Sequence, residues 1–166
     1  MRKEPCARVV TRALLYAGVA IGPACAQAAT TGATFNVTAT VVASCTVSAS
    51  NVAFGNYGAA QTDATGTLSA TCTNLTAYTV GLDAGTGSGA SVSSRKMTGP
   101  SSQTLDYTLY QDTTRLVVWG NTVGVDTVAG VGNGGTQTIT VSGRVPAAQY
   151  PGAGSYSDTV TVTVTY

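Results

Sequence analysis

The strongest structural signal in this sequence is the alternation of its last twelve residues, SYSDTVTVTVTY. The apolar residues share the even positions and threonines fill most of the odd ones; the even set is Tyr156, Val160, Val162, Val164 and Tyr166. A period of two predicts a β-strand with one buried and one exposed face. This strand carries no proline, lysine or bulge signal that would protect a free edge, and such an edge invites pairing with another chain.

The same alternation recurs from residue 34 onward. Its first instance, TFNVTATVVASCTV, places apolar or small side chains at alternate positions: Phe35, Val37, Ala39, Val41, Ala43 and Cys45. Further strands are predicted at GTLSATCT, AYTVGLDA, TLDYTLYQD, RLVVWG and TQTITVSGRV, with glycine-rich loops between them. Seven or eight short strands without a helical pattern predict a single all-β domain, a sandwich of immunoglobulin-like type.

The first 28 residues have the composition of a secretory signal peptide. Basic residues come first, an apolar run follows from about Ala13 to Ile21, and small residues occupy positions 24, 26 and 28. Cleavage is predicted after Ala26 or Ala28. A membrane anchor would need about 20 apolar residues, roughly twice the run present here. We therefore expect export of the chain, with no membrane insertion after cleavage.

Export also bears on the cysteines. Cleavage would remove Cys6 and Cys25, leaving Cys45 and Cys72 as the only pair. In an oxidising compartment a disulfide between them is expected. The alternatives are two separate buried thiols, or a metal site that would have to form without any histidine.

Charge and residue types argue against several classes of function. The chain after residue 28 has four basic residues and six aspartates, a net charge of −2, which does not suit binding to nucleic acid or anionic membrane. It contains no histidine and no paired acidic residues, so no catalytic, metal or cofactor site is predicted and an enzyme is not expected. Four aromatic residues could form a ligand platform or simply pack in the core: Tyr78, Tyr107, Tyr110 and Trp119.

The order of several short motifs resembles the spore coat protein U domain family, which includes subunits of archaic, Csu-type chaperone-usher pili. The motifs are SCTVSASNVAFGNY, GTLSATCTN, YTVGLDAG, RKM, LDYTLYQD, WGN, VSGRVPAAQ and GSYSDTVTVTVTY. They cover nearly the whole chain after the signal peptide.

This resemblance implies an incomplete immunoglobulin-like sandwich that lacks its last strand. In such pilins a periplasmic chaperone fills the resulting groove, and the N-terminal extension of the next subunit replaces it at the outer-membrane usher. Residues 29–42 would then be the donor extension and 43–166 the pilin domain. The donor side chains would be Phe35, Val37, Ala39 and Val41, and the groove edge would include Val160, Val162, Val164 and Tyr166.

The leading hypothesis from the sequence is a structural subunit of such a pilus. It would be exported to the periplasm and assembled at the cell surface with other copies or related subunits, for adhesion and biofilm formation. Two alternatives stay open: a secreted monomeric sandwich that binds carbohydrate through its tyrosines, and a spore or cell coat protein that assembles without an usher.

Overall fold

The computed structural model describes residues 27–166, so the signal peptide predicted over 1–28 lies almost entirely outside the described residues. Residues 27–38 form no strand and their side chains are exposed. Residues 39–166 make up a separate compact unit, which contains every strand described below. Among the described residues, no helix has the length and apolar character needed to cross a membrane.

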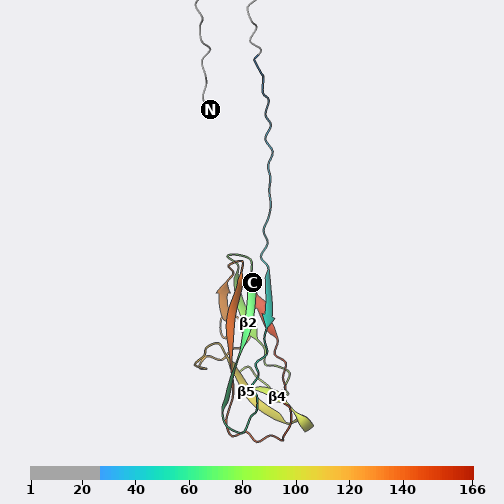
Figure 1. Cartoon of the computed structure of the whole chain (residues 1–166), viewed down its shortest axis with the longest axis vertical. Coiled ribbons are helices and arrows are strands. Elements are labelled where there is room, and N and C mark those ends of the chain that lie inside the picture. Colours follow the sequence, from blue (N-terminus) through green and yellow to red (C-terminus); the bar gives the residue numbers. More distant parts are fainter. Residues whose placement is uncertain (1–26) are drawn as a thin grey trace, which may run out of the picture. The chain divides into compact units, whose positions relative to one another are not determined.

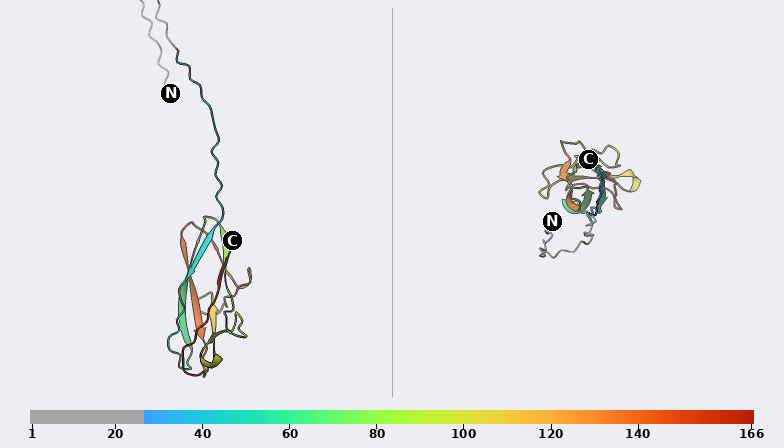
Figure 2. Two further views of the ribbon diagram at one scale, coloured as in Figure 1. Left: turned by 90° about the vertical axis from the view of Figure 1, so that its right-hand side faces the viewer. Right: turned by 90° about the horizontal axis from the view of Figure 1, so that it is seen from above.

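The compact unit consists of two antiparallel β-sheets (Figures 1 and 2). Its strands are β1 (Cys45–Ala49), β2 (Thr62–Cys72), β3 (Ala77–Leu82), β4 (Arg95–Thr98), β5 (Thr104–Tyr110), β6 (Val128–Val131), β7 (Thr136–Val145) and β8 (Val162–Thr165), with one short 3₁₀ turn at Pro100–Ser102. One sheet has the order β1-β2-β7-β5-β4 and the other β6-β3-β8. The prediction of an all-β, immunoglobulin-like sandwich is confirmed.

The core lies between the two sheets and is built by the alternating residues of the long strands. On β2, Leu68, Ala70 and Cys72 are buried, whereas the residues between them are half-exposed. On β3, Tyr78, Val80 and Leu82 are buried in the same way. The period-two prediction for these strands therefore identified their inner faces correctly.

Trp119 and two of the tyrosines singled out in the sequence belong to this core. Trp119 is fully buried and its indole Nε1 donates to the carbonyl of Val80 at 2.9 Å. Tyr78 and Tyr107 are buried as well, and Tyr110 is half-buried. Trp119, Tyr78 and Tyr107 therefore pack between the sheets, whereas Tyr110 lies on the other face of β5 and is outside the core.

Arg95 is a buried charged residue whose donors all go to backbone carbonyls. Its guanidinium donates to Leu82, Asp83, Val92 and Trp119, over distances of 2.7 to 3.0 Å. The side chain is 0 % exposed, and this burial lowers its pKa from the usual value. Arg95 thus joins the end of β3 to the loops around Val92 and Trp119.

Three strand predictions need correction. RLVVWG forms no strand; it contributes only an isolated bridge between Val118 and Tyr110, because a turn stabilised by the Asp112 carboxylate comes before it. TFNVTATV likewise forms no strand, since residues 35–41 have no pairing partner among the described residues. The C-terminal strand is shorter than predicted and begins only at Val162.

The predicted disulfide is present and joins β1 to the end of β2. Cys45 and Cys72 are direct cross-strand partners and their sulfurs are bonded. A closed loop spanning 27 positions gives a stabilisation of about 3.5 kcal/mol in the loop-entropy model.

Replacing both cysteines by alanine is therefore expected to lower the melting temperature by about 10–20 °C. The change can be followed by circular dichroism. The double variant should not respond to a reducing agent, whereas the wild-type chain should lose the same amount of stability on reduction. Equal melting temperatures for the oxidised wild type and the variant would contradict this role of the disulfide.

Candidate functional site

A groove of about 520 Å³ opens between the residues that follow β1 and those that precede β8. Residues 49–54 line one wall and residues 156–160, with Val162, line the other. The floor consists of core side chains: Leu68, Leu82, Leu109, Val141, Tyr107 and Met97. The floor of the groove is therefore made by side chains that also belong to the hydrophobic core of the sandwich.

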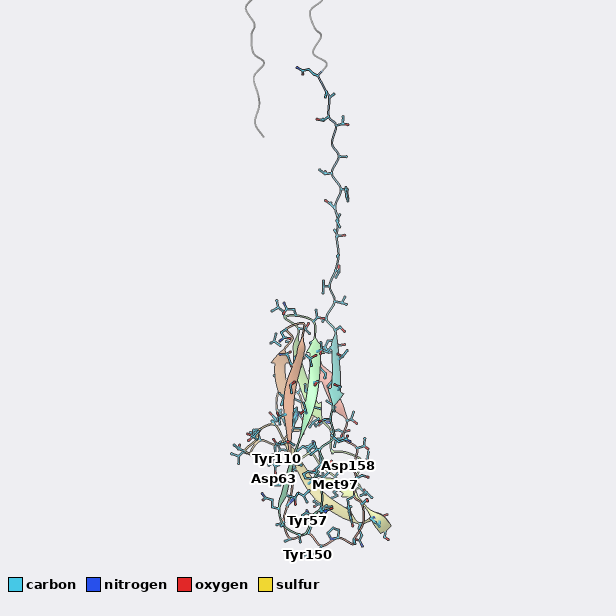
Figure 3. All side chains as sticks on the ribbon, in the orientation of Figure 1. Tyr57, Asp63, Met97, Tyr110, Tyr150 and Asp158 are labelled. Carbon is cyan, nitrogen blue, oxygen red and sulfur yellow. A yellow bond between two sulfur atoms is a disulfide. The ribbon has the colours of Figure 1, made fainter. Side chains whose placement is uncertain are left out.

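The groove continues into a second cavity of about 830 Å³ towards one end of the sandwich. The two cavities share residues 52–54, Met97 and Tyr156, so they form one continuous depression. Met97 and Asp158, labelled in Figure 3, line the first cavity, and Tyr57 and Tyr150, labelled below them, line the second. An extended peptide would fit such a shape better than a compact ligand.

The edge of β8 that faces away from β3 has free backbone groups. Asp83 N–H donates to Thr161 O at 3.1 Å, so the odd-numbered residues of this segment direct their N–H and C=O groups towards β3. The even-numbered Val160, Val162 and Val164 direct theirs to the opposite side. Within residues 27–166 no backbone hydrogen bond reaches them there.

β1 presents a similar edge from the other sheet. Ser44 O accepts from Thr73 N–H and Ser50 N–H donates to Thr67 O, so the even-numbered residues of β1 pair with β2. The odd-numbered Val47 and Ala49 then direct their backbone groups away from β2. β1 and β8 have Cα atoms within 8 Å of each other, yet in the described part of the chain no ladder joins them. The sandwich is therefore open along this side.

The wall that leads into β8 is fixed by two aspartates. Asp158 accepts from the backbone and side chain of Thr86, both at 2.8 Å, and from the Tyr107 hydroxyl at 2.7 Å. Burial, reinforced by Asp158, raises the pKa of Tyr107 well above its usual value, so the phenol remains a donor. Asp83 accepts from Thr161 N–H at 2.9 Å. The groove wall is thus held in place without any strand to cover it.

The segment predicted to be the donor exposes its apolar side chains. Phe35 is 85 % exposed, Val37 84 % and Val41 83 %, and Ala39 is exposed too. All residues from 27 to 44 are exposed, so these apolar side chains are not buried by any part of residues 27–166.

Thr73 holds residues 42–44 by hydrogen bonds. Its hydroxyl has one proton, which the carbonyls of Val42 and Ser44 share at 3.4 and 3.3 Å, and its oxygen accepts from Ser44 N–H at 3.1 Å. Together with the disulfide at Cys45, these bonds hold residues 42–44 alongside the end of β2. In the described part of the chain, Val42 is the first residue with a hydrogen bond, and the compact unit begins slightly earlier, at Ala39.

The residues predicted for the groove edge have different positions in the structure. Val160 and Val162 line the groove, and Val164 packs partly buried against the core. Tyr166 is 58 % exposed and lines a separate shallow depression on the β6-β3-β8 sheet, next to Val131.

Sequence reasoning did not identify the opposite wall, formed by residues 49–54. Val52 and Phe54 have the alternation that could have indicated it, in the stretch NVAFGNY. In the described residues no cluster of three potential metal ligands occurs. What the arrangement offers chemically is an apolar floor with two unpaired strand edges, which suits peptide binding.

Comparison with known proteins agrees with this geometry. The family model of the Spore Coat Protein U domain matches residues 31–163. Protein U of Myxococcus xanthus is 36 % identical over 165 residues, which cover 89 % of this chain and 90 % of that protein.

A similar solved structure is the CsuC–CsuE chaperone–tip adhesion subunit pre-assembly complex from the archaic chaperone-usher Csu pili of Acinetobacter baumannii. It matches with a TM-score of 0.57 and 26 % identity over 76 % of this chain. The match spans only 40 % of the chain in that structure.

Proposed function

The chain belongs to the spore coat protein U domain family, and from this we propose that it is a structural subunit of an archaic chaperone-usher pilus, assembled by donor-strand exchange. The observation that carries the proposal is the open groove, whose floor is the core of the sandwich and whose β8 edge has no backbone partner among the described residues. A groove lined by core side chains, beside a strand edge without a backbone partner, is suited to receive a strand from elsewhere.

The donor in this proposal is residues 29–42 of a second copy or of a related subunit. Phe35, Val37 and Val41 would each contribute about 1.5 to 3 kcal/mol if fully buried, and Ala39 less. Backbone hydrogen bonds to the free edge of β8 would add to this. Residues 43–166 form the accepting domain, with Val160, Val162 and Val164 at its edge and Tyr166 just beyond the groove.

Further partners follow from the same proposal. An exposed apolar groove must be shielded before assembly, which is the role of a periplasmic pilus chaperone, and an outer-membrane usher would then exchange chaperone for donor. The similarity to a subunit crystallised with its chaperone supports the first partner. The chain would be exported by a signal peptide at residues 1–28 and located at the cell surface, where the fibre serves adhesion and biofilm formation without catalytic activity.

Phe35→Asp tests the proposal directly. A charge at a position that must be buried should weaken each subunit–subunit contact by about 2 kcal/mol or more, roughly 30-fold in affinity. Polymers should then dissociate at a lower temperature, measured by the loss of high-mass bands on gels after graded heating.

Asn36→Asp is the matched control, since it introduces the same charge one residue later, on the polar phase of the segment. It should leave heat resistance close to that of the wild type. Equal heat resistance for both variants would count against donor-strand exchange through this segment. Fibres that form without an usher would instead favour the coat-protein alternative.

A further inference from the structure

Met97 is one of the residues that the two cavities of the groove share. On β4 it shares the inner face with the buried Arg95, and its cross-strand partner is Leu105. It lines both cavities and packs half-buried against the core. In residues 27–166 it is also the only methionine, because the second one in the sequence is Met1.

Met97 is partly exposed, and several of the side chains that line its cavity are apolar. Leu105, Phe54 and Tyr156 line the same cavity. A thioether suits these neighbours because it is apolar and adaptable. A sulfoxide does not, since its polar S=O group would have to be desolvated when a strand covers the groove.

We propose that Met97 is an oxidative modification site whose accessibility is controlled by groove occupancy. Hydrogen peroxide is the oxidant: the sulfur lone pair attacks one peroxide oxygen, the O–O bond breaks, an S–O bond forms and water is released. The sulfur is oxidised by two electrons to the sulfoxide and the peroxide is reduced. An oxidised subunit accepts a donor strand poorly, whereas a bound donor protects the methionine. The second half of this inference rests on the proposed function.

The test treats the purified chain lacking residues 29–41, which form no strand, with hydrogen peroxide, alone and with a synthetic peptide of residues 29–42. Oxidation is measured by mass spectrometry as a gain of about 16 Da on the peptide containing Met97. We expect oxidation in the free chain, at least about tenfold slower oxidation with the peptide bound, and at least about tenfold weaker binding of the peptide to the oxidised chain. In the variant Met97→Leu, whose new side chain has a similar volume and no sulfur, treatment with peroxide should not change the affinity for the peptide.

The outcomes separate the two ideas. Resistance of Met97 to peroxide in the free chain, or equal peptide affinity before and after oxidation, would overturn the modification site while leaving donor-strand exchange intact. A peptide that fails to bind the unoxidised chain would overturn the proposed function and the protection it implies.

Discussion

Deletion of residues 29–41 is expected to abolish fibre growth while leaving the sandwich folded. The deleted residues form no strand, and the bonds of Thr73 to Val42 and Ser44 remain. The variant keeps its own groove but lacks the segment that we propose fills the groove of a neighbouring copy. Co-expressed with its chaperone and usher, it should accumulate as a chaperone-bound monomer, measured by size-exclusion chromatography and by counting surface fibres in electron micrographs.

The control for this deletion changes only the polar phase of the same segment. Replacing Asn36, Thr38 and Thr40 by serine keeps all four apolar positions and should give fibres in normal amounts. Mixed with the wild type, the deletion variant should shorten fibres, because it can accept a donor but cannot supply one. Fibres of normal length from the deletion variant alone would disprove the assignment of the donor.

Arg95→Met is expected to destabilise the sandwich by at least about 4 kcal/mol. The side chain makes four hydrogen bonds to carbonyls, and bonds to a charged group are worth about 1.5 to 3 kcal/mol each. Methionine fills much of the volume but leaves the carbonyls of Leu82 and Trp119 without this donor inside the protein. Since domains of this size have a total stability of about 5 to 15 kcal/mol, the variant should be largely unfolded or degraded.

Urea denaturation of the purified wild type and variant gives the measurement, with absence of a folded baseline as the expected result for Arg95→Met. Lys96→Met provides a matched control on the neighbouring residue. Lys96 forms an ion pair with Asp106 at 2.7 Å on the partly exposed face of β4. Such surface pairs contribute about 0 to 1 kcal/mol. A loss of stability of similar size in both variants would contradict the role assigned to Arg95.

The sequence predicted those strands in which alternation is uninterrupted. β2, β3, β5 and β7 lie where the period-two segments indicated, and the disulfide pairs as expected. RLVVWG failed because local hydrogen bonds prevailed: the Asp112 carboxylate accepts from the Thr114 hydroxyl and from the Val117 and Leu116 N–H groups, and these bonds lower its pKa to about 2. The strand before Val162 is interrupted for a similar reason, since Asp158 accepts from Thr159 N–H.

The groove could be predicted only in part. Its β8 wall follows from the alternation of the C-terminal residues, but the opposite wall depends on glycines in β2 and β7. A Cβ added to Gly143 would lie 2.8 Å from the Phe54 ring, and one added to Gly66 would lie 2.7 Å from Val52. These two glycines give room for the wall to pack on the sheet, and a glycine within a strand pattern does not reveal which distant residue approaches it.

The exposed segment that precedes the sandwich in the chain affects the symmetry of any assembly. Under the proposed function, residues 29–42 of one copy enter the groove of another, so contacts run head to tail. Head-to-tail contacts that do not close into a ring give an open filament. Each copy added to the end of the filament then presents an unfilled groove or a free donor segment of its own, so a further copy can be added.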